Sequence, residues 1–466
     1  TVLLAIVGMA VSSPALVGPD EPAHQATASY TSVHVLPPIA ETEDYTPGIL
    51  KFGACTAGNS AQDASCEPTR DDVTPGKVRI FNYPPPYYWV VGLGQKFAPT
   101  ADTWLDVGGR VASLLLNLAG LALLAVILRR RVRHWGTYLL LVSTPMAVFL
   151  WAVVNPNGWE ITTGLLFAAV FASSWWGTNA HSSKGHAKWS ALVLLGILSV
   201  AFALSRHDAI VWLALLIVAI LLMGRSPLAR VEQAKVLAIT SLGLVAGLIW
   251  QVTHPAQHID HNPDRVADPG LGDYLHWLSQ IDEFLPVRLR QMVGVLGWLD
   301  TPTPQILVLL LVIGWAAFIG FLFARTKIPI LVLVVGFLGT FVVPSILEVL
   351  RWNDWPYWYQ GRITLPFVLP FLLVFLLRYA GRGSRAATAL SLISAISLAF
   401  MVWQNLMRYA FGTKDYIPTR WDSPAIGAIW FWMGVVIVAV MVLLTAMRLA
   451  LFVSERHRAN ASSIET

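Results

Sequence analysis

Two adjacent acids and a histidine follow the first apolar run of this 466-residue chain, where a hydrophobic protein has little need of charge. The stretch VGPDEPAHQATASY, residues 17–30, contains Asp20, Glu21 and His24. A carboxylate held there could accept a proton from a hydroxyl nucleophile. The structural alternative is that Asp20 and Glu21 cap a short interfacial helix beginning at Pro22, because negative charge is favourable at a helix N-terminus.

Arginines stand at the ends of later apolar runs, on the same side of the membrane as these acids. Arg206 and Asp208 follow the fifth run, Arg351 follows the ninth, and Gln360 and Arg362 precede the tenth. The planar fork of an arginine can bind two phosphate oxygens at once. Acids and arginines at one level therefore predict a site for a phosphate-bearing substrate. For Arg206, Asp208 and Arg351 the alternative is charge that merely snorkels to the interface.

Further polar residues lie at the same ends. Tyr83 belongs to FNYPPPYYW (81–89), whose three prolines predict a rigid extended segment before the second run. Asn155 opens NPNGWE after the third run, and Asp300 lies in GWLDT before the eighth. Arg110, just inside the second run, is expected to snorkel outward rather than bind substrate.

The composition places these residues in a membrane protein. The chain is 56% hydrophobic and only 13% charged, with mean hydropathy +0.60, whereas a soluble domain carries about 25% charged residues. Each apolar run of about 17–25 residues can cross a hydrocarbon core. We expect an all-α polytopic protein, one integral membrane domain over residues 1–466, with about 12 transmembrane helices. The expected spans are 1–17, 105–128, 136–154, 161–178, 189–205, 209–223, 236–253, 304–324, 328–347, 363–377, 386–403 and 427–447.

Charge predicts the orientation. With both termini in the cytoplasm, the inward segments hold 17 of the 32 basic residues and only three acids, as the positive-inside rule requires. The net charge of +5 is thus a topological signal and gives no reason to invoke nucleic acid. The first run is expected to be a membrane anchor, the alternative being a signal peptide. The large outward loops are then 18–104 and 254–303, and residues 284–299 suit an amphipathic interfacial helix.

The two cysteines, Cys55 and Cys66, both lie in the first outward loop. Their separation is compatible with a local disulfide, which an oxidising outer compartment would preserve. Two free thiols are the alternative.

The outward motifs, in this order, resemble the bacterial DUF2142 family of polytopic membrane proteins. They are PDEPAH after the first span, YPPPYY before the second, NPNG after the third, GWLDT before the eighth and YQGR before the tenth. The family is similar in outline to the GT-C glycosyltransferases, which take a sugar from a polyprenyl-phosphate carrier on the outer face. The resemblance extends from about residue 15 to about residue 370.

The resemblance implies roles for particular residues. Asp20 matches the GT-C general base and Glu21 its partner, while Arg362 is the first candidate for the donor phosphate, followed by Arg206 and Arg351. Asp300 matches a family position without an assigned role. The family pattern often continues with tyrosine, and Ile363 stands there instead. Some GT-C relatives hold a divalent cation between acids, so Mg²⁺ or Mn²⁺ stays open as a cofactor.

The leading hypothesis is an inverting glycosyltransferase of a bacterial plasma membrane, acting as a monomer on a glycan, lipid or protein acceptor. His24, Tyr83, Asn155, Asp208, Asp300 and Gln360 complete its expected substrate site. A composition rich in Ala, Val and Trp leans towards an actinobacterial source, which favours arabinose or mannose. The rivals are a lipid-linked sugar transporter or flippase and a non-catalytic envelope assembly factor. Polar chemistry at one face, with almost no charge in mid-span, argues against a transporter.

Overall fold

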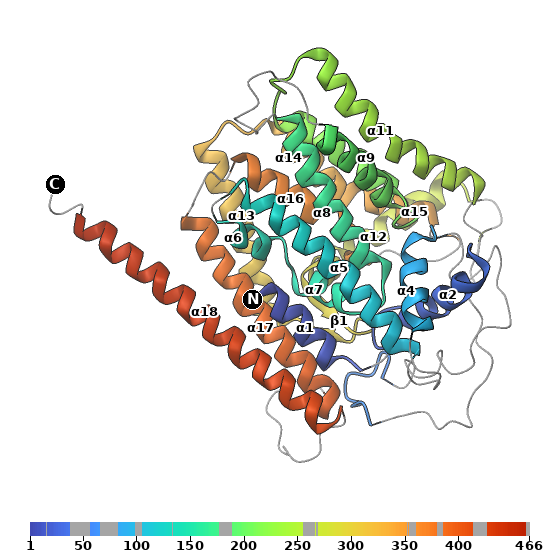
Figure 1. The fold of residues 1–466 in the computed structure, drawn as a ribbon, viewed down its shortest axis with the longest axis vertical. Helices are drawn as coiled ribbons and strands as arrows, with labels where there is room; N and C mark the ends of the chain where they lie inside the picture. Colours follow the sequence, from blue (N-terminus) through green and yellow to red (C-terminus); the bar gives the residue numbers. More distant parts are fainter. Residues whose placement is uncertain are drawn as a thin grey trace.

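The computed structural model describes residues 1–14, 16–37, 56–65, 83–97, 105–132, 134–176, 189–254, 266, 269–351, 353, 360–379, 385–412 and 426–462. Within them, the side chains of 105–106, 281–284, 351 and 455–462 are left out. The described chain is almost entirely helical, which confirms the all-α prediction (Figure 1). Its one hairpin joins two antiparallel strands of two residues each, β1 (Val295–Leu296) and β2 (Thr301–Pro302).

The helices follow the apolar runs of the sequence. Their bounds are α1 Val2–Ser12, α2 Glu21–His34, α4 Pro86–Lys96, α5 Leu105–Arg129, α6 Trp135–Leu141, α7 Pro145–Ala152, α8 Pro156–Trp175, α9 Trp189–Ala203, α10 Ala209–Met223, α11 Arg230–Thr253, α12 Leu271–Gly294, α13 Gln305–Arg325, α14 Ile330–Phe337, a π-helical turn Leu338–Val342, α15 Val343–Arg351, a 3-10 turn Gly361–Thr364, α16 Leu365–Tyr379, α17 Arg385–Phe411 and α18 Ala428–Ser462.

Among the described residues, seven helices are long and apolar enough to cross a membrane, or eight if one bent pair counts as a span. These helices make the chain a multi-pass membrane protein, but the expected number of about 12 is not confirmed. The first, fifth and sixth expected spans correspond to the shorter apolar helices α1, α9 and α10. The third is broken into α6 and α7 with a 90° bend. Pro145 cannot continue a helix, and the Thr144 hydroxyl accepts from the Ala147 amide to start α7 afresh.

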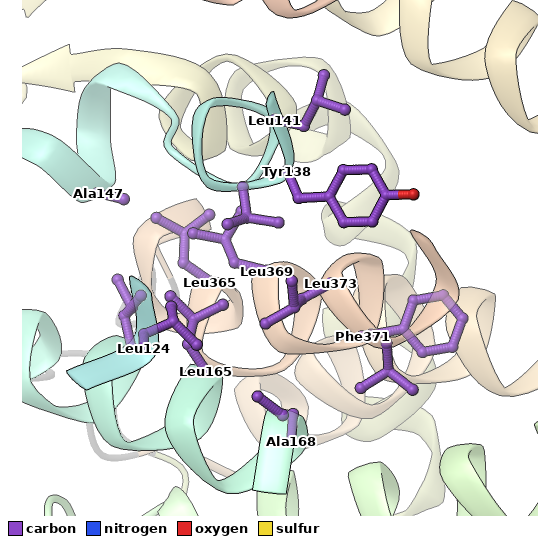
Figure 2. Close-up of a cluster of buried hydrophobic side chains, with 14 of the residues drawn as sticks. Leu124, Tyr138, Leu141, Ala147, Leu165, Ala168, Leu365, Leu369, Phe371 and Leu373 are labelled. Carbon is purple, nitrogen blue, oxygen red and sulfur yellow. The ribbon is translucent and has the colours of Figure 1, made fainter. Parts of the chain in front are cut away.

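The core surrounds α8, which is buried along most of its length. Leu165 and Ala168 of α8 face Leu369 of α16 (Figure 2). A Cβ on Gly164 would come within 3.1 Å of the Pro366 carbonyl oxygen, so glycine lets these two helices approach closely. The helices at the edge are different, because only 11% of the apolar window of α18 is buried. In Figure 1 this helix runs beside α1 and α17 and continues beyond the body.

Two local predictions need correction. The proline segment 81–89 is not extended throughout, because α4 begins at Pro86, where a proline at the first helical position costs no hydrogen bond. The helix expected over 284–299 lies earlier, at Leu271–Gly294, since residues 295–302 turn back as the β1–β2 hairpin.

Candidate functional site

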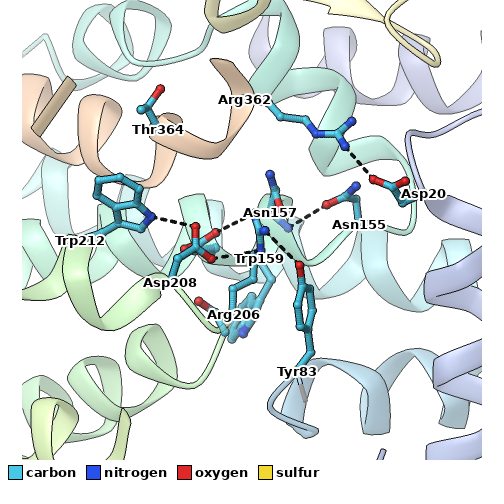
Figure 3. A network of polar contacts seen from close by, with 12 residues as sticks. Asp20, Tyr83, Asn155, Asn157, Trp159, Arg206, Asp208, Trp212, Arg362 and Thr364 are labelled. Atoms are coloured by element: carbon cyan, nitrogen blue, oxygen red, sulfur yellow. Dashed lines mark hydrogen bonds and ion pairs between the residues drawn. The ribbon is translucent and has the colours of Figure 1, made fainter. Parts of the chain in front are cut away.

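The structure brings the first acid and the last arginine of the sequence motifs into direct contact. Nη2 of Arg362 donates to Oδ2 of Asp20 at 2.7 Å, across 342 positions of the chain (Figure 3). The arginine side chain is 6% exposed and that of Asp20 is 50% exposed. Nε and Nη1 of Arg362 have no hydrogen-bond partner among the described residues. The pair is therefore an accessible carboxylate beside a buried cation with donors to spare.

Asp20 sits in a turn rather than serving as a helix cap. It precedes α2, but its side chain makes no capping hydrogen bond, and its φ of 60° is left-handed. Residues with short polar side chains such as Asp tolerate that region better than most non-glycine residues. The turn therefore directs the Asp20 carboxylate away from the helix end and towards Arg362.

Glu21 occupies the opposite environment from its neighbour. Its carboxylate is fully buried and is held by Arg110, with Nε to Oε1 at 2.9 Å and Nη2 to Oε2 at 2.7 Å. The amides of Gly18 and Val154 donate to the same carboxylate. Arg110 also donates to the carbonyls of Ser13 and Pro14. Arg110 thus points inward, contrary to the expected snorkelling, and Glu21 and Arg110 together fix the turn that carries Asp20.

The NPNG motif supports this turn from the other side. Asn155 caps α8 by accepting from the Asn157 amide, and its own amide donates to the Pro19 carbonyl at 2.8 Å. A Cβ on Gly158 would lie 2.4 Å from the Leu150 carbonyl oxygen, so only glycine allows α7 to pass this close. Asn155 therefore acts on the position of Asp20 through the backbone.

Arg206 has a polar or charged neighbour at each of its nitrogens, and only its Nε makes no hydrogen bond among the described residues. Nη1 donates to Asn157 Oδ1 and lies 3.6 Å from Glu160, Nη2 donates to the Tyr83 hydroxyl at 3.1 Å, and Nε lies 3.5 Å from Asp208. Its guanidinium also lies over the Tyr83 ring. All these side chains except Tyr83 are buried, so Arg206 and Asp208 do not form a snorkelling surface pair. Two acidic side chains therefore lie within 4 Å of this arginine, whereas Arg362 has one, Asp20.

His24 lies one helical turn after Asp20, on α2. Its Nδ1 is 2.9 Å from the hydroxyl of Tyr88, and its ring lies 6.1 Å from that of Tyr83, centroid to centroid. Burial lowers the pKa of the imidazole well below its usual range, and the positive charges of Arg206 and Arg362 lower it further. Burial and the two arginines therefore favour the neutral form of His24.

Arg362 is positioned by a close backbone contact. A Cβ on Gly361 would lie 2.1 Å from the Arg288 carbonyl oxygen of α12, and the Gly361 amide donates to Gln291 Oε1 at 2.8 Å. The neighbouring Gln360 has a buried Oε1 without a hydrogen-bond partner among the described residues. Glycine in this motif thus lets α12 pack directly on the turn that presents Arg362.

The residues of this arrangement lie within a sequence match to a known protein family. The family model described as "Predicted membrane protein (DUF2142)" matches residues 3–372. The chain belongs to this family. The DUF2142 match includes Asp20, Glu21, Arg206 and Arg362 and ends before α17.

Curated proteins and solved structures are less similar to the chain than the family model is. No curated protein matches the chain. Among solved structures, the crystal structure of ArnT from Cupriavidus metallidurans bound to undecaprenyl phosphate is similar at a TM-score of 0.45 and 14% sequence identity, covering 96% of this chain and 76% of that one. A likeness at this level says nothing of activity.

Asp300 belongs to a separate cluster. Its Oδ2 lies 3.3 Å from Nη2 of Arg408 on α17, and both side chains are buried. Arg408 also donates to the backbone carbonyls of Thr56, Asn59 and Gln62. This pair fastens the described piece of the first loop, residues 56–65, to α17.

Some predicted residues lie outside what the structure describes. Cys55 and Cys66 are among them, so the disulfide stays a prediction, and only the backbone of Arg351 is described. No group of three or more His, Cys, Asp or Glu side chains within the described ranges could hold a metal ion. The predicted site residues did not include Glu160, Asn157 or Tyr88, although the motifs NPNGWE and YPPPYY contain them. Glu160 and Asn157 follow Asn155 on the first turn of α8, so helical spacing from the NPNG motif was the available signal.

Proposed function

We propose that this DUF2142 protein is a membrane glycosyltransferase that moves a sugar from a polyprenyl-phosphate carrier to a hydroxyl group of a cell-envelope acceptor. One observation carries the proposal. A half-exposed carboxylate, Asp20, lies 2.7 Å from a buried arginine, Arg362, two of whose nitrogens have no hydrogen-bond partner among the described residues. A base beside an unsatisfied anion-binding group is what transfer from a phosphate carrier needs.

Arg362 holds the donor phosphate in this proposal. A buried donor without a partner is costly, and an incoming phosphate oxygen would satisfy Nε and Nη1 with charge-assisted hydrogen bonds. Arg206 is a weaker candidate for phosphate, because its terminal nitrogens already donate to Asn157 and Tyr83 and its Nε lies 3.5 Å from Asp208. We assign it instead to holding Tyr83 and Asn157 in place around the site.

Asp20 acts as the general base. An acceptor hydroxyl oxygen attacks the anomeric carbon, the bond from that carbon to the phosphate oxygen breaks, and the electron pair leaves with the carrier phosphate. The hydroxyl proton passes to Asp20, which is accessible enough to release it to water afterwards. Attack opposite the leaving group inverts the anomeric configuration. Glu21 takes no proton, because Arg110 and two backbone amides already occupy both of its oxygens.

The membrane setting follows from the sequence. The distribution of basic residues favours a bacterial plasma membrane with cytoplasmic termini and the site facing outward. The carrier would then reach Arg362 laterally from the outer leaflet. Arabinose and mannose are the sugars favoured by composition, and a glycan, lipid or protein hydroxyl is the acceptor.

Radiolabelled polyprenyl-phosphate sugar incubated with membranes that contain the protein tests the proposal. The wild-type protein should discharge the carrier and yield free polyprenyl phosphate, and Asp20→Asn should not. Asparagine retains the shape and tolerates the left-handed φ of 60°, so this variant is a matched control. A carrier that stays intact with every donor and acceptor tested would identify a transporter or an assembly factor instead.

A further inference from the structure

We propose that Tyr88 fixes His24 in the tautomer that carries its proton on Nε2, so that a neutral N–H joins Arg362 as a hydrogen-bond donor to the carrier phosphate. The inference rests on the proposed function for the identity of the ligand alone. His24 is then a substrate-binding group and Tyr88 a positioning residue.

The hydrogen bond between His24 and Tyr88 can run in either of two directions. Nδ1 of His24 and the Tyr88 hydroxyl oxygen are 2.9 Å apart, and both side chains are buried. Either atom could donate by geometry alone, because imidazole and phenol can each serve as donor or acceptor. The surroundings of Tyr88 decide between the two possibilities.

Within the described ranges, the hydroxyl of Tyr88 makes one hydrogen bond, with His24. It packs with Ala28, Tyr87 and Val91 in a small apolar cluster and is fully buried. Among the described residues, His24 Nδ1 is the group with which its hydroxyl makes a hydrogen bond. Burial raises the pKa of Tyr88 well above its usual range, so the phenol stays protonated. If Nδ1 carried a hydrogen, the phenolic O–H would point at no acceptor, and a buried donor is rarely left unsatisfied.

The position of the ring proton follows from the chemistry of neutral imidazole. When Nδ1 accepts from Tyr88, the single ring proton must reside on Nε2, which then donates. Protonation of both nitrogens is opposed by burial and by Arg206 and Arg362, which lower the pKa of His24. No hydrogen bond from Nε2 occurs within the described part of the chain, so this donor is available to a ligand.

His24 lies one turn after Asp20 on α2, since its amide donates to the Asp20 carbonyl at 3.0 Å. Asp20 in turn meets Arg362, which leaves Nε and Nη1 for an anion. A neutral donor adds a hydrogen bond to phosphate without adding a third positive charge beside Arg206 and Arg362.

The tautomer can be measured without any substrate. In purified protein labelled with ¹⁵N-histidine, the resonance absent from His24→Gln identifies His24. Its nitrogen shifts should show a protonated Nε2 and an unprotonated Nδ1 acceptor at neutral pH. Tyr88→Phe should shift this signal towards a mixture of the two tautomers. A protonated Nδ1 in the wild-type protein, or no change in Tyr88→Phe, would overturn the inference.

Binding of polyprenyl phosphate measures the consequence. His24→Gln places an amide NH₂ near the position of Nε2, so it should bind within a few-fold of wild type. His24→Asn has a shorter side chain and should bind roughly ten- to hundredfold more weakly, as expected for one hydrogen bond to a charged group. Tyr88→Phe should weaken binding in the wild-type background but not in His24→Gln, where no tautomer remains to be set. Equal binding by His24→Gln and His24→Asn would overturn the proposed role of Nε2.

The two proposals can fail separately. If the lipid phosphate binds as described but no sugar is ever transferred, the glycosyltransferase proposal fails and the donor role of His24 stands. If transfer occurs and is insensitive to the identity of residue 24, the role of His24 fails and the transferase proposal stands.

Discussion

Two aspartate–arginine pairs join distant parts of this protein, and they differ in what they leave unsatisfied. Asp20 is half exposed, and its partner Arg362 leaves Nε and Nη1 without a partner among the described residues. Asp300 and Arg408 are both buried, and the terminal nitrogens of Arg408 also bind three backbone carbonyls of residues 56–62. The first pair combines a half-exposed acid with two unpartnered arginine nitrogens, whereas the second is buried, holds a loop on α17 and leaves only Arg408 Nε without a partner among the described residues.

An ion pair between distant motifs does not by itself mark a functional site. The combination of a half-exposed acid with two unpartnered nitrogens on one buried arginine marks it. The adjacent acids Asp20 and Glu21 differ in the same way, because the Glu21 carboxylate is fully buried and accepts four hydrogen bonds. The following substitutions separate activity from stability at the two pairs.

Asp20→Asn should have the largest effect on activity. Loss of a general base lowers turnover roughly 10²- to 10⁴-fold, while the melting temperature in detergent should stay near that of wild type because Asp20 is half exposed. Initial rates of carrier discharge measure the first quantity and thermal unfolding the second. Asp300→Asn is the matched control at the other pair and should lower the melting temperature instead. Turnover preserved in Asp20→Asn would remove Asp20 as the base.

Arg362→Lys should have the second-largest effect on transfer activity. Lysine retains the charge but loses the planar set of donors, so we expect transfer to fall roughly 10²- to 10³-fold, as for the loss of one oxyanion donor. Competition between labelled and unlabelled polyprenyl phosphate should show weaker binding in the same variant. Wild-type affinity in Arg362→Lys would argue that the phosphate binds elsewhere.

Arg408→Met should act on stability. It leaves Asp300 as an uncompensated buried charge and frees the carbonyls of Thr56 and Asn59, which should cost about 3–5 kcal/mol. Limited proteolysis should cut the first loop faster in this variant. Per folded molecule, carrier discharge should remain within a few-fold of wild type. A variant as stable as wild type with abolished transfer would move this pair into the active site.

Gly361→Ala should have a smaller effect, which lowers both stability and transfer activity. The new Cβ would meet the Arg288 carbonyl oxygen at 2.1 Å, so the turn that presents Arg362 or α12 must shift, at a cost of about 1–3 kcal/mol. Because Arg362 follows directly, transfer should fall by more than the loss of folded protein explains. Gly320→Ala, whose Cβ meets nothing within 4 Å, is the neutral control.

The pH dependence of stability should show the smallest effect. The pKa of His24 is lowered by burial and by Arg206 and Arg362, so the unfolded chain binds a proton that the folded protein does not. Stability is therefore complete above the ordinary value of 6.5 and decreases as the pH falls below it, by at most about 1.4 kcal/mol per pH unit. Melting temperatures between pH 8 and pH 5 should fall less steeply in His24→Gln. Parallel curves would show that folding does not lower the pKa of His24.

The sequence predicted some of these features and not others. The motifs at helix ends placed Asp20 and Arg362 at one level of the membrane, and the structure brings them together. Hydropathy located the apolar helices but not α2, α4 or α12, and it predicted full spans at α9 and α10, which are only 15 residues long. It also could not foresee the 90° break before Pro145, which depends on local capping.

The roles of individual charges were the least predictable feature. Asp20 and Glu21 are neighbours with similar chemistry, and what distinguishes them is the ion pair that Arg110 makes with Glu21. Arg408 lies within a helix that the sequence predicted to end at residue 403, so its contact with Asp300 had no local signal. Such partners are set by packing between segments far apart in the chain.

The most direct test is a cryo-electron microscopy structure of the protein in lipid nanodiscs with polyprenyl phosphate. We predict phosphate density within hydrogen-bonding distance of Arg362 Nε or Nη1, with the Asp20 carboxylate beside it. Density for the lipid phosphate at a different place, with the contact between Asp20 and Arg362 intact and no ligand next to it, would contradict the account.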